Sequence, residues 1–279
     1  MMLIDTHLHL IYRDRLSYPW LAGVAALNRD FPLDAYEREA RRCGVTQSLH
    51  MEVDVAPDAI EAETRRVKEL AAKPQSLLRG AISACRPEDE GFAAFLDRQA
   101  ADPFVRGFRR VLHVVPDEVS QSQRFRENVR RLAERRLPFD ICVRADQLKL
   151  AAALIDACPE VQFVLDHCGV PGVKERAEHP WREDIGEVAR RPNVVVKISG
   201  VVAYADGESW TLDDIRPYVE HAIAKFGWSR VVWGSDWPVC TLTSSLSGWI
   251  AATHAITGGC SASERQALFE GNATRTWRL

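Results

Sequence analysis

The sequence lacks both long hydrophobic segments and an excess of either charge. No apolar run is long enough to span a bilayer, and the first residues enter a strand-like segment at once instead of forming a charged, then apolar, signal. Lysine and arginine number 36 against 39 aspartates and glutamates, for a formal net charge of −3. The two signs are interspersed, so we expect no strongly basic face and predict neither a membrane nor a nucleic acid as a partner.

The cysteines lack the spacing of a disulfide framework or of a structural zinc site. Seven are present, which is an odd number, and none of them forms a C-x-x-C pair. This usage is typical of reduced thiols and predicts a cytoplasmic protein.

The composition sets the size of the fold. The chain has 279 residues, of which 46% are hydrophobic and 27% charged, enough for one large core or two small domains. We find no linker, low-complexity tract or shift in composition, and therefore predict a single domain over residues 1–279. The sequence leaves open whether the protein forms a homo-oligomer.

Eight strand-like runs bounded by turn signals follow one another along the chain. Several are almost continuously apolar, which is typical of strands covered on both faces, as in a parallel sheet. The runs are "MLIDTHLHL" (2–10), "VTQSLHMEV" (45–53), "LLRGAISA" (77–84), "VRGFRRVL" (105–112), "PFDICVR" (138–144), "VQFVLDHCG" (161–169), "VVVKISGVV" (194–202) and "RVVWGSDW" (230–237).

Helical patterns lie between these runs. Apolar residues recur on one face in 59–73, 124–136 and 213–227. In the third of these, we expect Pro217 in the first turn, where a missing N–H costs little, and Gly227 just after the last turn. Ser261 and Glu264 have the spacing of a capping box and predict the start of the last helix.

The order of strand and helix, repeated about eight times, predicts the fold. The spacing of the runs matches βα units, and eight units in fewer than 300 residues indicate an α/β fold of the (β/α)₈ (TIM) barrel type. A doubly wound open sheet is the alternative. It would need a glycine-rich loop after the first strand, where this chain has "DTHLHL". We expect the aromatic first connection, residues 11–31, to lie over the mouth of the barrel.

Reactive side chains stand near the ends of most of these runs. The carboxyl ends of barrel strands converge on one face, so such residues come together in space. They are Asp5, His7 and His9; His50 and Glu52; Arg109, Arg110 and His113; Asp140, Cys142 and Arg144; Asp166, His167 and Cys168; Lys197 and Ser199; and Ser235 and Asp236.

Each of these residues also has a structural interpretation when taken alone. His7 and His9 face the same side of a strand and could hold a metal, polarise a carbonyl group or form a core pair. His167 alone is more typical of a core residue. Lys197 and Asp236 could each be a salt-bridge partner, and Asp236 could also be a helix cap.

Four further residues leave similar choices open. We interpret His50 and His113 as mainly structural. Of the neighbours Arg109 and Arg110, only one can point into the barrel. The combination of His7, His9, His167 and Asp236 at the ends of the first, sixth and eighth strands favours a functional site.

Several segments resemble those of a known family. They are "IDTHLHL" from Ile4, "GFRRVLH" from Gly107, "LDHCGVP" from Leu165, "NVVVKISG" from Asn193, "FGWSRVVWGSDWPVC" from Phe226 and "LFEGNATRTWRL" from Leu268. Together they are similar to the amidohydrolase-related (amidohydrolase 2) family. Within that family they are most similar to the sugar-lactonase branch, which includes L-fuconolactonase and L-rhamnonolactonase and is akin to 2-pyrone-4,6-dicarboxylate lactonase.

The resemblance implies a (β/α)₈ barrel and a set of roles. The general base would be Asp236, with His7, His9 and His167 beside it. Arg109 or Arg110 would bind the substrate, and we also expect Lys197 and Glu52 to contact it. The chain departs from the related lactonases at Glu52, where they more often carry glutamine. If Glu52 points inward, its charge disfavours an anionic substrate.

A second departure concerns metal ions. The binuclear members of the superfamily use a bridging lysine on the fourth strand and a histidine on the fifth, and this chain has neither in "GFRRVL" and "FDICVR". We therefore predict at most one divalent ion, Zn²⁺ or Mn²⁺, on some of His7, His9, His167 and Asp236. Catalysis without a metal stays open.

The predicted activity is the hydrolysis of a small lactone, such as a sugar-acid lactone from carbohydrate catabolism. Asp236 would take a proton from water, and the three histidines, or a metal that they hold, would stabilise the oxyanion. One alternative is non-oxidative decarboxylation of an aromatic or muconate-type acid on the same barrel. Another is a non-catalytic barrel that serves for binding.

Overall fold

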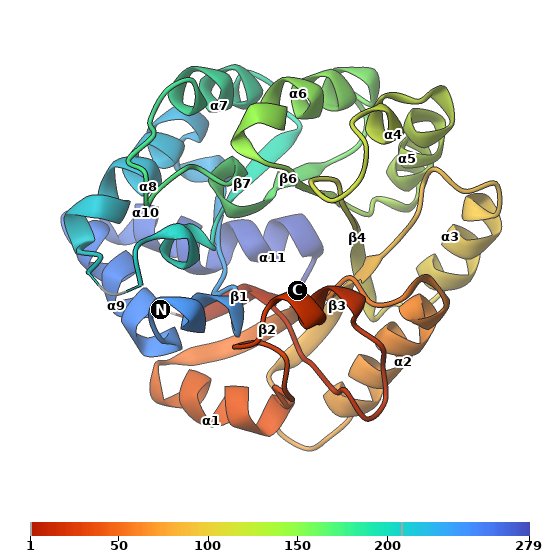
Figure 1. Ribbon diagram of the computed structural model, residues 1–279, viewed down its shortest axis with the longest axis horizontal. Coiled ribbons are helices and arrows are strands. Elements are labelled where there is room, and N and C mark those ends of the chain that lie inside the picture. Colours follow the sequence, from red (N-terminus) through yellow and green to blue (C-terminus); the bar gives the residue numbers. More distant parts are fainter. Residues whose placement is uncertain (1, 208) are drawn as a thin grey trace.

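The computed structural model describes residues 2–207 and 209–279. The described residues form one eight-stranded parallel sheet in which the strands pair in chain order, β1 to β8. Figure 1 shows the strands as a ring surrounded by helices. The strands are β1 (Leu3–Leu8), β2 (Val45–Met51), β3 (Leu78–Ala84), β4 (Val105–Val111), β5 (Phe139–Cys142), β6 (Phe163–Leu165), β7 (Val194–Ile198) and β8 (Val231–Trp233).

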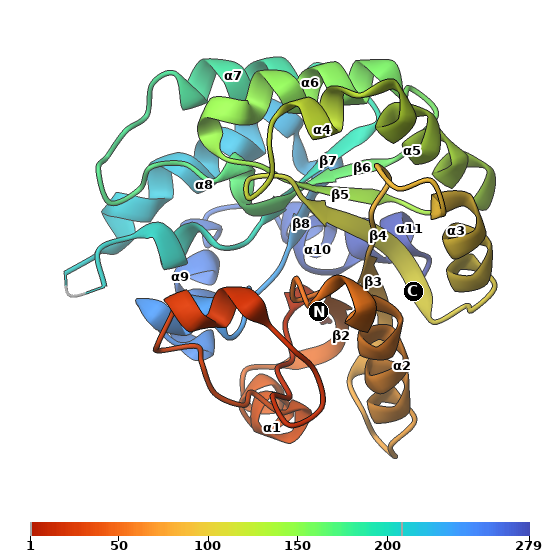
Figure 2. The same cartoon turned by 45° about the vertical axis from the view of Figure 1, so that its right-hand side comes forward.

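Helices connect consecutive strands and cover the outside of the ring (Figure 2). The α-helices are α1 (Leu33–Arg42), α2 (Ile60–Ala71), α3 (Phe92–Ala100), α4 (Glu118–Gln121), α5 (Gln123–Arg135), α6 (Leu148–Ala157), α7 (Trp181–Ala189), α8 (Leu212–Phe226), α9 (Leu246–Ile256), α10 (Ala262–Gln266) and α11 (Asn272–Trp277). Short 3₁₀ segments are η1 (Pro19–Gly23), η2 (Pro57–Ala59), η3 (Ala145–Gln147), η4 (Asp166–Gly169), η5 (Val201–Tyr204), η6 (Trp228–Arg230) and η7 (Val239–Leu242), and η8 (Ala267–Gly271) is a π-helical turn. The predicted (β/α)₈ barrel is confirmed.

The barrel closes where the first and last strands meet. Instead of a regular ladder, this seam has individual hydrogen bonds: Asp236 N donates to His7 O at 2.8 Å, and His9 N donates to Trp237 O at 2.7 Å. The side chain of Asp5 adds a third bond, because its Oδ1 accepts from Ser235 N at 2.8 Å. The two strand ends that carry His7 and Asp236 are thus joined directly.

Two apolar cores explain why the strands are almost continuously hydrophobic. The larger core fills the space between the strands and the surrounding helices. A smaller one fills the barrel interior, where Ile4, Ile82 and Val232 pack with Trp277 of α11. Figure 1 shows α11 behind the centre of the ring. Each strand therefore buries both of its faces, as in other parallel sheets.

The predicted helices are present, with one correction. Ser261 caps α10 as expected, and Gly227 follows α8 with a φ of 70°. However, the prediction that Pro217 lies in the first turn of α8 is wrong. Thr211 N donates to Asp214 Oδ2 at 2.8 Å, which starts the helix at Leu212 and places Pro217 in the helix interior.

Two further observations concern the helices and the cysteines. Over the described residues, no helix is both long and apolar enough to cross a membrane. All seven cysteines have free thiols, and five of them are buried.

Candidate active site

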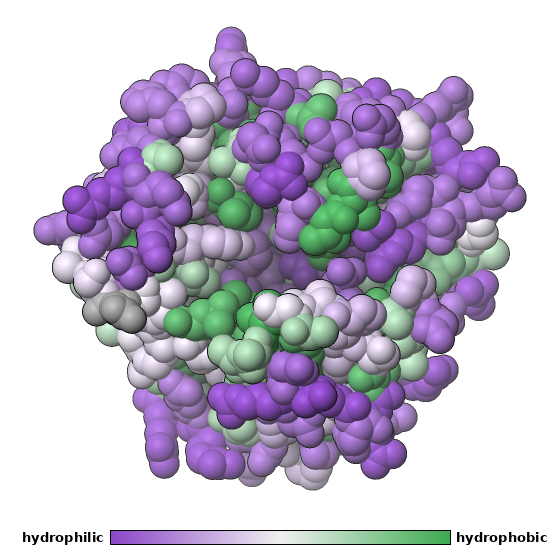
Figure 3. All heavy atoms as spheres, viewed as in Figure 1, coloured by the Kyte–Doolittle hydropathy of each residue, from purple (hydrophilic) through white to green (hydrophobic). Residues whose placement is uncertain are grey.

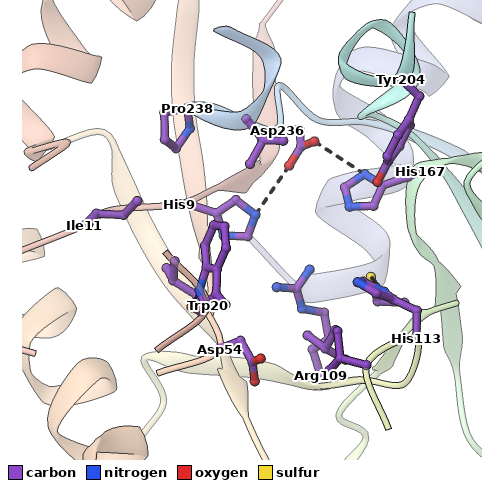
Figure 4. A pocket seen from close by; sticks show the side chains of 15 residues that line it. His9, Ile11, Trp20, Asp54, Arg109, His113, His167, Tyr204, Asp236 and Pro238 are labelled. Atoms are coloured by element: carbon purple, nitrogen blue, oxygen red, sulfur yellow. Dashed lines mark hydrogen bonds and ion pairs between the residues drawn. The ribbon is translucent and has the colours of Figure 1, made fainter. Parts of the chain in front are cut away.

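A cavity of about 210 Å³ opens at the carboxyl ends of the strands. His9, His167, Asp236 and Arg109 are among its lining residues (Figure 4). His7 lies directly beneath, fully buried, with its Nε2 3.1 Å from Nε2 of His9. The structure thus brings together the four residues that were expected to form the site. Figure 3 shows the corresponding hollow near the middle of this face.

Asp236 is the central acid of the cavity. Its Oδ1 lies 3.4 Å from His9 Nε2 and 3.7 Å from His7 Nε2, and its Oδ2 lies 3.9 Å from His167 Nδ1. Burial raises its pKa to about 6, although the positive charges that His167 and Arg109 can carry oppose the rise. The carboxylate is therefore mostly ionised at pH 7, yet it is a better proton acceptor than an exposed aspartate.

His7 in β1 and His9 just after it form an ordered chain of hydrogen bonds. The Lys197 ammonium, which can only donate, lies 3.2 Å from His7 Nδ1, closer than the Arg109 guanidinium lies to His7 Nε2 at 3.4 Å. We therefore place the proton of a neutral His7 on Nε2, where it points toward His9. His9 Nδ1 donates to the carbonyl oxygen of Met51 at 3.0 Å, which leaves His9 Nε2 as an acceptor. Burial, together with the charge of Lys197, lowers the pKa of His7 well below its usual range. Burial and then Arg109 lower the pKa of His9 to about 3. Both rings are therefore neutral at pH 7.

A layer of buried ion pairs lies under the cavity. Lys197 Nζ is 2.6 Å from Asp140 Oδ2 and 2.9 Å from Asp166 Oδ1. Arg109 Nε is 2.6 Å from Glu52 Oε1, and its Nη1 is 3.3 Å from Asp166 Oδ2. Lys197 and Glu52 do not line the cavity. The expectation that they contact the substrate is thus corrected: each is turned toward a buried partner of opposite charge.

The structure also separates Arg109 from Arg110. Arg109 points into the barrel and lines the cavity. Arg110 is the next residue on β4 and faces the other side, where its Nη2 pairs with Glu88 Oε1 at 2.7 Å. Arg110 is therefore not a substrate-binding residue in this geometry, because neighbours on a strand point to opposite faces.

The two other candidate histidines, His50 and His113, differ from each other. His50 is buried outside the cavity, 3.5 Å from Glu63 Oε1, in line with a structural role. His113 does line the cavity, and its Nδ1 lies 3.4 Å from Cys142 Sγ. Sequence reasoning missed Tyr204, which follows β7 and also lines the cavity.

The first connection reaches the site, as predicted. Ile11 and Trp20 from this segment are part of the cavity wall. In Figure 1, the red segment lies in front of the lower part of the ring. Its aromatic composition was the signal that could have singled out Trp20.

The backbone is strained where it carries the reactive side chains. Asp236, His167 and Cys168 all have positive φ angles, of 57°, 53° and 52°. Each such conformation costs about 1–3 kcal/mol in a residue other than glycine. Gly200 makes room for His167, since a Cβ at Gly200 would lie 2.4 Å from His167 Nδ1. The surrounding structure therefore holds His167 and Asp236 in orientations that a free chain avoids.

The donor atoms of His7, His9 and Asp236 fit one divalent cation. Their separations of 3.1, 3.4 and 3.7 Å are close to the spacing of about 3.3 Å between tetrahedral ligands that each lie about 2.0–2.1 Å from Zn²⁺. His9 has a lone pair on Nε2, which accepts the proton of His7 when no ion is bound. His7 would have to move its proton to Nδ1, next to Lys197. The guanidinium group of Arg109 lies 3.4 Å from His7 Nε2 and already brings a positive charge close to the position that the cation would take.

A second set of potential ligands is already occupied by a side chain. His7, Asp166 and His167 also lie close enough together to hold an ion. However, the Lys197 ammonium bonds both Asp166 and His7 there. Over the described residues, the fit is therefore for one ion.

Comparisons with known proteins give a consistent assignment. A family model described as "Amidohydrolase" matches residues 4–279. An L-fucono-1,5-lactonase of Burkholderia multivorans is 30% identical, over 99% of this chain and 96% of the relative. An uncharacterised protein of Sinorhizobium fredii, y4mH, is also 30% identical, over 99% of this chain and 98% of its own length. A crystal structure of a zinc-bound amidohydrolase from Burkholderia multivorans has a TM-score of 0.90 and 28% identity, with both chains covered completely.

Proposed function

This chain belongs to the amidohydrolase family, and we propose that it opens the ring of a small lactone with water activated by Asp236. One observation carries the proposal: a buried carboxylate with a pKa of about 6 lies on the cavity floor between His9 and His167. The Burkholderia relative named as an L-fucono-1,5-lactonase supports a lactone as the substrate class.

The reaction needs one base and a set of hydrogen-bond donors. Asp236 accepts a proton from water while the water oxygen attacks the lactone carbonyl carbon. When the ring C–O bond breaks, Asp236 returns this proton to the leaving alkoxide, which stays attached to the product. The carboxylate thus ends the cycle ionised, as it began.

The donors for the oxyanion differ from those expected from the sequence. The proton of His7 is directed to His9, and that of His9 to the Met51 carbonyl, so neither is free for the substrate. We assign this role to His167 and Arg109, which line the cavity. Loss of a single donor of this kind typically costs about 3–4 kcal/mol of transition-state stabilisation.

A metal ion, where bound, would be held by His7, His9 and Asp236. Zn²⁺ or Mn²⁺ at this position would act as a Lewis acid that polarises the carbonyl group.

The cavity charges disfavour the decarboxylase alternative. An aromatic or muconate-type acid needs a free cation for its carboxylate. Of the lysines and arginines in the described chain, only Arg109 lines the cavity, and Glu52 and Asp166 already neutralise it. A purely binding barrel is disfavoured as well, because it has no need of a base held in a strained backbone conformation.

A hydrolysis screen tests the proposal. A pH indicator would follow acid release from a panel of lactones, for wild type and Asp236→Asn. We expect kcat to fall by about 10²–10⁴ in the variant, the usual contribution of a general base. Asp146→Asn, at an exposed acid, is the matched control and should keep full activity. Near-normal kcat in Asp236→Asn would rule out the assigned base, and release of carbon dioxide without any lactone hydrolysis would favour the decarboxylase.

A further inference from the structure

The cavity has one polar side and one apolar side. In Figure 4, Tyr204, His113 and His167 lie opposite Ile11, Trp20 and Pro238. Six large apolar residues from four different strand ends or loops line the cavity. We call them the apolar wall: Ile11, Trp20, Val53, Val111, Val114 and Val239.

The wall presents almost no hydrogen-bonding groups to a ligand. The only polar side-chain atom in it is the indole nitrogen of Trp20, and that nitrogen donates to Val53 O at 2.8 Å. The hydroxyl groups of a polyhydroxylated ring would therefore lose water there without gaining a partner, which weakens binding.

Arg109 and Asp54, two charged residues of the cavity lining, are engaged by other groups of the protein. Arg109 donates from Nε to the Glu52 carboxylate at 2.6 Å and from Nη2 to the Glu52 carbonyl at 2.7 Å. Asp54, at the rim, pairs with Arg86 at 3.3 Å. The cavity therefore offers no free cation for an anionic substrate, and a hydroxyl group held against the apolar wall would find no hydrogen-bond partner there.

The apolar surface continues from the cavity to the outside. Val114 lines the cavity and is 58% exposed, more than the other exposed large hydrophobic residues of the described chain. Figure 3 shows hydrophobic residues beside the hollow. Apolar patches that continue into a pocket mark ligand-binding surfaces.

We propose that the substrate is a neutral lactone with a small hydrocarbon substituent, alkyl or aryl, which packs on the apolar wall. This inference rests on the proposed lactone hydrolysis, and it names the substrate class within that function. The lactone carbonyl lies toward Asp236 and His167, and the substituent lies toward Trp20 and Val111. A cavity of about 210 Å³ limits the substituent to a few carbon atoms.

A homologous series of lactones tests the proposal. We would compare kcat/KM for δ-valerolactone, δ-hexalactone and δ-octalactone with that for D-glucono-1,5-lactone, after subtracting spontaneous hydrolysis. Each buried methylene group should raise kcat/KM by about fourfold until the cavity is full. The polyhydroxylated lactone should react at least about tenfold more slowly than δ-hexalactone. Equal kcat/KM values across the series, or a higher value for D-glucono-1,5-lactone, would overturn the inference while leaving lactone hydrolysis intact. Failure to hydrolyse any lactone would instead remove the proposed function.

Two variants on β4 test whether the preference for substituted lactones arises at the apolar wall. Val111→Thr places a hydroxyl in the wall with almost no change in shape, and Val105→Thr makes the same change at an equally buried position of β4 outside the cavity. We expect Val111→Thr to reduce the preference for δ-octalactone over δ-valerolactone by about fivefold or more, the equivalent of one to two methylene groups. Val105→Thr should keep the wild-type preference. If Val111→Thr does not fold, Val114→Thr at the exposed rim should reduce the same ratio. An unchanged ratio in the folded wall variant would contradict the proposed contact.

Discussion

Glu52→Gln tests how strongly a buried ion pair neutralises the charge of Arg109 in the cavity. Glutamine keeps the shape of the side chain but removes its charge, so the 2.6 Å bond from Arg109 Nε loses its charge assistance, at a cost of about 1 kcal/mol. Glu52 Oε2 also accepts from Asp54 N at 2.7 Å, and an amide NH₂ group at that position leaves a buried donor unpaired, at about 1–3 kcal/mol. Because Asp166 still neutralises part of the guanidinium charge, we expect a total loss of about 3 kcal/mol, at the lower end for a broken buried pair.

Urea unfolding at pH 7 measures this loss, and the melting temperature should fall by about 6–12 °C. The control is Glu90→Gln, whose pair with Arg124 is largely exposed, and which should change stability by less than about 1 kcal/mol. Burial raises the pKa of Glu52, but Arg109 outweighs it and holds the pKa below the ordinary value of 4.5. The difference in the free energy of unfolding between wild type and Glu52→Gln should therefore reach its full value above pH 4.5. It should shrink as the pH falls through the lower pKa that Glu52 has in the folded state.

The charge change should also alter selectivity. With Glu52 neutral, the guanidinium group of Arg109 becomes available to an anion, so kcat/KM for a carboxylated lactone should rise about tenfold relative to a neutral one, the equivalent of about 1.4 kcal/mol. A stability loss no larger than that of Glu90→Gln, together with unchanged selectivity, would refute the reasoning.

Three other predictions follow from the same geometry. In wild type, kcat/KM should rise with pH through about 6, because only the ionised Asp236 accepts a proton; a flat profile from pH 5 to 8 would exclude it as the titrating base. Elemental analysis after loading with Zn²⁺ or Mn²⁺ should find no more than one ion per chain, because Lys197 occupies the second set of ligands; two tightly bound ions would contradict this. Arg136 ends α5 with a φ of 53°, so Arg136→Gly should raise the free energy of unfolding by about 0.5–1 kcal/mol, and a lower melting temperature would show that the arginine makes a stabilising contact there.

The sequence predicts the strands well because their environment is uniform. A run such as Val194–Ile198 is buried on both faces, so its composition alone identifies it. Alternation also predicts that only one of Arg109 and Arg110 faces inward, but not which one, because that choice depends on the register of the whole barrel. Lys197 illustrates a different limit. It lies inside the barrel as expected, but acids on two other strands draw it below the cavity floor. Tyr204 could not be assigned, because it lies on a loop, where side chains follow no period.

The seam of the barrel has a consequence for the order of folding. The bond from Ser235 Oγ to His7 O joins residues 228 positions apart, and Asp236 N bonds to the same carbonyl oxygen. Contacts of such sequence separation form late, because the intervening chain must first lose most of its conformational freedom. In a chain whose eighth strand has not yet docked, His7 and His9 therefore lie at the end of an edge strand without Asp236 beside them, and the chain is inactive. Turnover begins only when the eighth strand docks, so the onset of product formation during refolding would report when the barrel closes.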